Sequence, residues 1–380
     1  QGVVVGICLL RPLGLRLNSI SFGPINYASR DVLEKPYISK TQMQRIPLSY
    51  HVENKEIVFS LYYPNAKEVV IRWVNGELHL KQCNDAWTGS VPAEGDIFSV
   101  QVIVDGNEVL SPTLPIGFSC NMPFNYVDIP ADPMYCIQDV PHGSICQEFV
   151  RNSVTGQWER IQIYLPAEYH TSQDKDYPVL YLQHGYGENE SVWITQGKLN
   201  FLLDNLIAEN KAVPMIVVMC CGMMVTADGS RSEYHLFDRF LLQDVIPYLT
   251  LRYRIRKDRE YCAMAGLSMG SIQTSRSVLS HPDRFAFMGL FSGFLSDILS
   301  GHSEYLSPVQ IAKFKAMGVY LYRAIGTEDI YFSDFENDSR FLAENGMACD
   351  TRFFSGRHEW SVWRKCIAEF VLCIFKNEKN

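Results

Sequence analysis

The segment Gly-Leu-Ser-Met-Gly, residues 266–270, places one serine between two glycines. A short apolar run before it, residues 261–266, predicts a strand, and residues 269–282 after it predict a helix. A strand-to-helix turn this tight leaves no room for side chains beside the serine, and it raises the hydroxyl above the end of the strand. We therefore predict that Ser268 is a nucleophile.

A serine hydroxyl attacks at neutral pH only when a base accepts its proton and a carboxylate orients that base. In an α/β sheet the three groups follow the chain order serine, acid, histidine, each at a strand end. Asp329 follows a strand predicted at 319–326, and His358 follows one predicted at 349–356. We predict Asp329 as the acid and His358 as the base.

Other residues of the same types leave alternatives open. Glu328 and Asp334 neighbour Asp329 and are the other candidates for the carboxylate. His281 lies about one helix length from Ser268, and His302 lies in a helix-rich segment, so both fit the role of the base less well.

The oxygen of a reacting carbonyl gains negative charge, which needs preorganised N–H donors. The backbone N–H of Met269, directly after the nucleophile, is one candidate. The second is the N–H of Tyr186, in the turn His184-Gly185-Tyr186-Gly187 that follows a buried strand. We expect His184 itself to anchor this turn by hydrogen bonding.

The elements that must position these residues alternate between strands and helices. Alternation of this kind predicts a mostly parallel sheet with helices on both faces, that is, an α/β layered domain. Paired strands within residues 140–166 come first. The strands after them are predicted at 177–185, 214–221, 261–266, 285–293, 319–326 and 349–356, and the helices at 198–211, 239–253, 269–282, 307–318, 335–346 and 360–376.

The residues before this region have a different pattern. Residues 56–64, 68–74, 95–106 and 110–118 are rich in Val, Ile, Phe and Tyr, and turn residues separate them. This pattern predicts an antiparallel sandwich of the immunoglobulin type. We predict three regions: an arm or leader remnant at 1–40, the β-sandwich at 41–137 and the α/β domain at 138–380.

Composition narrows the classes of partner. The net charge is -8 and there is no basic run, so a nucleic-acid partner is not expected. Arg11 interrupts the apolar start of the chain too early for a membrane span. The 11 cysteines are scattered, without a C-x-x-C pair of metal-ligand spacing, so we expect free thiols, no metal and no other cofactor. Such thiols favour a reducing compartment, such as the cytoplasm, or an anaerobic source.

Several motifs in order resemble the esterase-D-like branch of α/β hydrolases. They are VPHGSI, RIQIYLP, PVLYLQHGYGENESVW, VIPYLTLRYR, AMAGLSMGS, HPDRFAFMGLFSG, IGTED and SGRHEWSVWR, and they span about residues 138–376. The pattern is similar to the feruloyl and acetyl xylan esterases of the first carbohydrate esterase family, with enterochelin esterases nearby. Such enzymes are often exported, so the resemblance also allows secretion.

The resemblance implies the same site residues, with Ser268, Asp329 and His358 as the triad. Two positions depart from the family pattern. Ser271 stands where a third glycine is usual, which predicts slightly looser packing, and Arg357 stands where a glycine commonly precedes the histidine.

The resemblance also suggests the substrate. We expect a serine esterase that releases ferulate or another hydroxycinnamate from arabinoxylan-type saccharides, with acetate on xylan as the alternative acyl group. Aromatic residues near the predicted mouth could hold a phenolic ring: Tyr186, Trp193, Phe294, Tyr331 and Trp360. The oligomeric state stays open.

Two other functions fit the sequence less well. Esterases of catechol siderophores also pair a front β-domain with an α/β domain, so the resemblance allows this reaction. This acidic sequence, however, has few basic residues for a trianionic ligand. A pure binding protein is disfavoured because all three triad members are present.

The front region resembles glycogen-binding or isoamylase-type modules. Since Trp73 and Trp87 fit a core better than a glycan surface, we expect this region to be a structural or substrate-shaping partner of the α/β domain.

Overall fold

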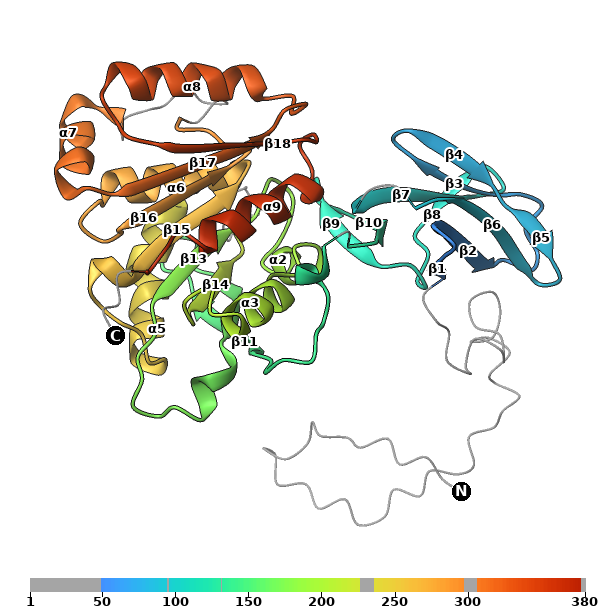
Figure 1. Ribbon diagram of the computed structural model, residues 1–380, viewed down its shortest axis with the longest axis horizontal. Helices are drawn as coiled ribbons and strands as arrows, with labels where there is room; N and C mark the ends of the chain where they lie inside the picture. The colour runs from blue at the N-terminus through green and yellow to red at the C-terminus, as the bar shows by residue number, and fades with distance from the viewer. Residues whose placement is uncertain (1–48, 94–95, 131, 226–235, 297–305, 377–380) are drawn as a thin grey trace, which may run out of the picture. The chain divides into compact units, whose positions relative to one another are not determined.

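The structure is a computed structural model. It describes residues 49–93, 96–130, 132–225, 236–296 and 306–376. The chain divides into two compact units, residues 1–49 and residues 50–380. The predicted arm, residues 1–40, lies outside the described residues, and the strands and helices labelled in Figure 1 all belong to the second unit.

Two antiparallel sheets form the first part of this unit. One has the strand order β1-β2-β6-β5, and the other has the order β4-β3-β7-β10-β9 with β8 paired to β7. Their bounds are Tyr50–Glu53 (β1), Glu56–Tyr62 (β2), Val69–Trp73 (β3), Gly76–His79 (β4), Lys81–Cys83 (β5), Ala86–Pro92 (β6), Ile97–Val104 (β7), Asn107–Val109 (β8), Ile116–Ser119 (β9) and Met122–Asp128 (β10).

Both antiparallel sheets bury side chains in one shared core. Phe59 and Trp87 of the first sheet lie in the same cluster as Ile71 and Val102 of the second. The sequence-based prediction of antiparallel strands here is confirmed, and Trp87 is buried as expected. Strands β4 and β5, between residues 76 and 83, were missed because they are short and largely polar, with little apolar alternation.

An eight-stranded sheet forms the second part, in the order β11-β12-β14-β13-β15-β16-β17-β18. The strands are Ser144–Arg151 (β11), Trp158–Leu165 (β12), Val179–Gln183 (β13), Ile216–Cys220 (β14), Cys262–Leu267 (β15), Phe287–Phe291 (β16), Tyr320–Gly326 (β17) and Asp350–Phe354 (β18). Strands β11 and β12 run antiparallel to each other, and the six other strands run parallel to one another. The predicted mostly parallel sheet is confirmed.

Helices cover both faces of this sheet (Figure 1). They are Val192–Thr195 (α2), Leu199–Ala208 (α3), Phe237–Phe240 (α4), Ile246–Arg252 (α5), Met269–Ser280 (α6), Pro308–Met317 (α7), Phe332–Glu344 (α8) and Trp360–Val371 (α9). Helices α2, α3 and α9 pack on one face, while α4 to α8 supply side chains to the core on the other. Along β15, Ala263 and Ala265 face the first core and Met264 faces the second, as a strand covered on both sides requires.

The helix predicted at 239–253 is interrupted by one turn of π-helix, Leu241–Val245. Pro247 follows this turn, and its nitrogen has no hydrogen to donate to the preceding turn. None of the described helices combines the length and apolar character needed to span a membrane. The ten cysteines among the described residues are free thiols.

Candidate functional site

The loops after three parallel strands carry the residues predicted to act together. Ser268 follows β15, Asp329 follows β17 and His358 follows β18. In the sheet β16 alone separates β15 from β17, and β18 lies beside β17. Because parallel strands end at the same edge, this order brings side chains 90 residues apart in sequence into reach of one another.

The turn at Ser268 is strained and closely packed. Ser268 has φ 50 and ψ -118, values that residues with a side chain seldom adopt. A Cβ atom at Gly266 would lie 2.4 Å from the carbonyl oxygen of Gly270, and one at Gly270 would lie 2.5 Å from that of His184. The two glycines are therefore required for space, as the sequence predicted.

Hydrogen bonds join the three side chains. His358 Nδ1 lies 2.9 Å from Asp329 Oδ2, and His358 Nε2 lies 2.9 Å from Ser268 Oγ. An ionised carboxylate can only accept, so the imidazole proton is assigned to Nδ1. Nε2 is then left as the acceptor for the Ser268 hydroxyl, which is the arrangement a general base needs.

Asp329 is buried and remains ionised at neutral pH. Burial acts to raise the pKa of its carboxyl group, but the hydrogen bond and charge of His358 and the N–H of Tyr331 outweigh burial and hold the pKa below its ordinary value. The Tyr331 N–H donates to Asp329 Oδ1 at 3.0 Å. The carboxylate is therefore suited to fix the imidazole and to stabilise its charged form.

The loop after β13 lies against the nucleophile. A Cβ atom added at Gly185 would stand 3.6 Å from Ser268 Cβ. His184 anchors the loop from inside, since its Nδ1 donates to the Gly185 carbonyl at 2.8 Å and its Nε2 accepts from the Gly222 N–H at 2.8 Å. Burial lowers the pKa of His184 to about 4, so this imidazole is neutral and structural.

Sequence reasoning missed two residues that support the site. Glu188 is buried, and its carboxyl group accepts from the Gly185 N–H at 2.8 Å and from Trp360 Nε1 at 3.0 Å. Ser271 is fully buried, and its Oγ donates to the Ser268 carbonyl at 2.5 Å and accepts from the Phe294 N–H at 2.8 Å. The sequence offered a signal only for Ser271, the departure from the expected glycine, and its hydroxyl ties the turn to the next loop.

The aromatic residues predicted at the mouth lie at different depths. Trp193 is fully buried with its Nε1 donating to the Gln183 carbonyl, and Phe294 and Trp360 are 3% and 7% exposed. Tyr331 is partly exposed, with its ring centroid 5.1 Å from that of His358. Tyr186 is 42% exposed. Tyr331 and Tyr186 are thus the two of this set with surface to offer a ligand.

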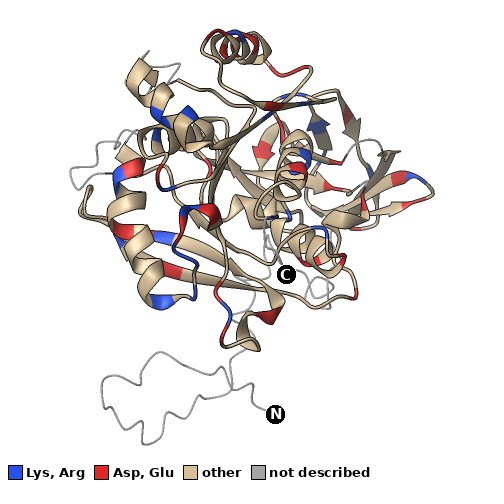
Figure 2. Ribbon diagram, turned by 60° about the vertical axis from the view of Figure 1, so that its left-hand side comes forward, with Lys and Arg blue, Asp and Glu red and all other residues tan. Residues whose placement is uncertain are grey.

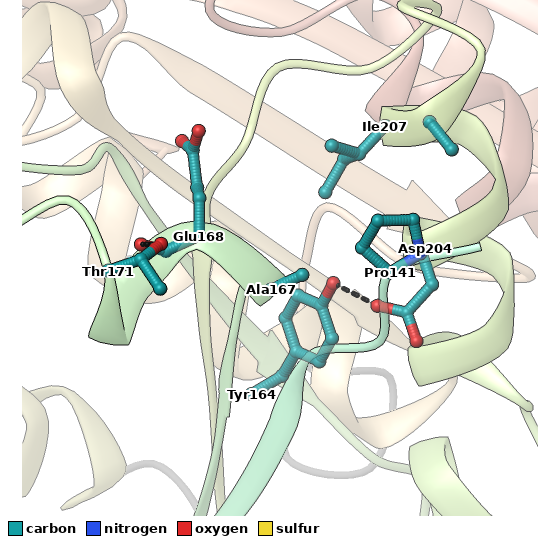
Figure 3. A pocket seen from close by; sticks show the side chains of 8 residues that line it. Pro141, Tyr164, Ala167, Glu168, Thr171, Asp204 and Ile207 are labelled. Atoms are coloured by element: carbon teal, nitrogen blue, oxygen red, sulfur yellow. Dashed lines mark hydrogen bonds between the residues drawn. The ribbon is translucent and has the colours of Figure 1, made fainter.

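A hollow of about 440 Å³ lies elsewhere on the molecule, lined by residues of β12, α3 and the segments next to them. Tyr164, Asp204 and Ile207 are among its lining residues (Figure 3). The Tyr164 hydroxyl already donates to Asp204 at 2.6 Å, and Asp204 also accepts from the Gly143 N–H. None of the lining residues belongs to the site at Ser268, and we assign the hollow no role.

Known proteins share both sequence and fold with this chain. Residues 153–372 match the family model described as "Putative esterase". The chain is 31% identical over 337 residues to the endo-1,4-beta-xylanase/feruloyl esterase of Xylanibacter ruminicola, an alignment that covers 84% of the chain and 44% of the relative. The chain therefore spans less than half the length of this relative. The alignment also extends well outside the family match, into the antiparallel sheets.

Solved structures share the fold. A ferulic acid esterase of Anaeromyces mucronatus, solved with ferulic acid, matches with a TM-score of 0.57 at 22% identity, covering 64% of this chain and 95% of that one. The enterobactin esterase of Shigella flexneri matches with a TM-score of 0.62 at 14% identity, covering 88% of this chain and 97% of that one. At these identities the likeness concerns the fold alone.

Proposed function

The chain belongs to the esterase family whose model its residues 153–372 match, and we propose that it is a serine esterase acting on hydroxycinnamoyl esters of plant saccharides. The observation that carries the proposal is the pair of 2.9 Å contacts made by His358, one to Ser268 Oγ and one to Asp329 Oδ2.

Each residue has a role in this reaction. Ser268 Oγ attacks the ester carbonyl while His358 Nε2 takes the hydroxyl proton. The N–H groups of Met269 and Tyr186 donate to the oxyanion that forms. When the intermediate collapses, the ester C–O bond breaks and His358 returns the proton to the leaving sugar alcohol. Water then attacks the acyl-enzyme by the same route and releases the acid.

The choice of acyl group rests on sequence similarity and on the exposed surface of two tyrosines. The relative with 31% identity carries a feruloyl esterase activity in its name. The ring of Tyr331 lies beside that of His358, Tyr186 is exposed in the loop whose Gly185 lies against Ser268, and both rings suit a phenolic acyl group. Acetate, which needs no aromatic wall, is the alternative acyl group.

A catechol siderophore ester is the weaker candidate. Its ligand is trianionic, whereas acidic and basic residues are interspersed along the described part of the chain (Figure 2). Arg357, the basic residue nearest His358 in sequence, lies 3.9 Å from the carboxylate of Glu328. Among the described residues, the loop at His358 therefore provides little uncompensated positive charge.

Hydrolysis of methyl ferulate, p-nitrophenyl acetate and enterobactin tests the proposal. We expect turnover of the first two, and a loss of about 10⁴-fold or more in kcat for Ser268→Ala. Ser277→Ala, at a buried serine of α6, is the control and should retain activity. Turnover of the acetyl ester alone would refute the hydroxycinnamoyl assignment, and undiminished hydrolysis by Ser268→Ala would refute the serine mechanism.

A further inference from the structure

The hairpin formed by β9 and β10 contacts the loop that follows β13. Its two-residue turn is Cys120-Asn121, with φ 51 and 63. The Asn121 N–H donates to the Gly187 carbonyl at 2.9 Å. A hairpin of the antiparallel sheets therefore binds the backbone of Gly187, the residue next to Tyr186.

Gly187 has no side chain because the hairpin turn occupies that space. A Cβ atom at Gly187 would lie 2.3 Å from Asn121 N and 2.5 Å from Cys120 Cα, both backbone atoms that no rotamer change can move. Gly187 also has φ 70, in the left-handed region that favours glycine. The turn and the loop are thus packed backbone against backbone.

The hairpin is itself held in place by residues that follow the same loop. Gln196 Oε1 accepts from the Phe118 N–H at 2.9 Å, and Gln196 is fully buried. The Tyr126 hydroxyl donates to the Thr195 carbonyl at 3.1 Å. Both strands of the hairpin are therefore held, and this fixes the position of the turn against Gly187.

From these contacts we infer that the Cys120-Asn121 turn is a positioning element of the esterase site, which holds residues 185–188 where the oxyanion donor must lie. The inference rests on the proposed function. His184 and Glu188 hold Gly185 from inside, and the hairpin holds Gly187 from outside, so the Tyr186 N–H between them is set from both sides. Stabilisation of the transition state then depends on the antiparallel sheets, and a small displacement of the donor is costly.

The chain provides a matched pair of turns for the test. Asn121 is exposed and is the second residue of its turn. Lys55 holds the same position in the two-residue turn between β1 and β2, where Asn54 and Lys55 have φ 51 and 66. Valine disfavours this backbone conformation and glycine accepts it. Asn121→Val should therefore displace the turn, while Asn121→Gly should keep it and Lys55→Val should disturb a turn of the other antiparallel sheet.

We expect Asn121→Val to lower kcat and kcat/KM by about 10- to 100-fold for both p-nitrophenyl acetate and methyl ferulate, with KM changed less than about twofold. Asn121→Gly and Lys55→Val should retain wild-type values. Gln196→Ala, which removes the acceptor for the Phe118 N–H, should reproduce the loss in kcat.

Two outcomes would overturn the inference. Wild-type kcat in both Asn121→Val and Gln196→Ala would show that the hairpin does not set the loop. A loss confined to methyl ferulate would mean that the hairpin contacts the acyl group and does not position the donor. In either case hydrolysis by the wild-type protein would leave the proposed function standing, whereas a wild-type protein without esterase activity would refute the proposed function itself.

Discussion

The indole N–H of Trp360 donates to the carboxyl group of Glu188 at 3.0 Å, across 172 residues of sequence. Trp360 begins the helix that follows His358, and Glu188 ends the loop whose Gly185 lies against Ser268. One buried carboxyl group thus links the loop that presents the base to the loop proposed to present the oxyanion donor. Perturbing this link should be detectable in both stability and activity.

Glu188→Gln should change how stability depends on pH. Burial raises the pKa of Glu188 to about 8, although its two hydrogen bonds act to lower it. The folded protein therefore keeps a proton that the unfolded chain releases near its ordinary pKa of 4.5. The stability from this protonated carboxyl is complete below about pH 4.5 and is lost as the pH rises toward 8. We expect the wild type to lose stability relative to Glu188→Gln over this range, by at most about 1.4 kcal/mol per pH unit.

Urea unfolding of both proteins at about pH 5, 6.5 and 8 measures this difference. Glu336→Gln, at an exposed glutamate of α8, serves as the control and should show the wild-type pH dependence. A difference between wild type and Glu188→Gln that stays constant from pH 5 to 8 would contradict the raised pKa.

Asp329→Asn should lower kcat by about 10⁴-fold while the protein stays folded. The asparagine can donate to His358 Nδ1 and so favours the tautomer whose Nε2 carries the proton, which cannot accept from Ser268 Oγ. Steady-state kinetics on p-nitrophenyl acetate measures the loss. Asp334→Asn, at the first turn of α8, tests the carboxylate left open by the sequence. If Asp334→Asn, and not Asp329→Asn, abolished activity, the assignment of the acid would be wrong.

Much of this site could be predicted from sequence because its chemistry is tied to strand ends. Ser268 and Asp329 each follow a largely buried strand, His358 follows a shorter strand that ends in two phenylalanines, and the fold fixes their chain order. The role of Glu188 could not be predicted, because it depends on burial against a residue 172 positions away. The burial of a side chain could not be predicted either. An aromatic residue near a motif, such as Trp193, can line the substrate site or pack in the core, and the structure places Trp193 in the core.

The contact between the hairpin and Gly187 was also beyond sequence reasoning. A glycine in a loop signals freedom of the backbone or lack of space, but it does not say which other segment fills that space. The strand β10 was not predicted at all, so the turn that precedes it had no recognisable partner. Both the lack of space at Gly187 and the position of this turn result from tertiary packing.

Ser271→Ala should destabilise the protein by about 1–3 kcal/mol, because it leaves the Ser268 carbonyl and the Phe294 N–H without this buried partner. We also expect kcat to fall, by about tenfold or less, since the turn that presents Ser268 Oγ becomes less constrained. Thermal unfolding and ester hydrolysis measure the two effects. Ser277→Ala is the matched control, because the Ser277 hydroxyl is buried and makes no hydrogen bond to the described residues. Equal effects of the two substitutions would argue against a specific role for Ser271.

Arg364→Met should destabilise the protein by about 3–5 kcal/mol, because it removes one partner of a buried charge cluster. Arg364 lies on α9 and is fully buried, and its Nη1 lies 3.0 Å from Asp96 and 2.9 Å from Asp128 in the antiparallel sheets. Burial already raises the pKa of Asp96, against the effect of Arg364. Without the guanidinium group, Asp96 would lose this ion pair, and Asp128 would keep the one to Lys198, whose Nζ lies 3.3 Å from its Oδ2.

Urea unfolding measures the cost of removing Arg364, and Arg352→Met is its control. Arg352 forms an ion pair with Asp350, but its side chain is 43% exposed, so its loss should cost about 1 kcal/mol or less. Adding Asp96→Asn and Asp128→Asn to Arg364→Met should recover part of the lost stability, because the carboxylate charge that Arg364 offset is removed as well. If the triple variant were no more stable than Arg364→Met alone, the loss would come from the packing of the arginine side chain and its hydrogen bonds to the Gln196 carbonyl, and the ion pairs would contribute little.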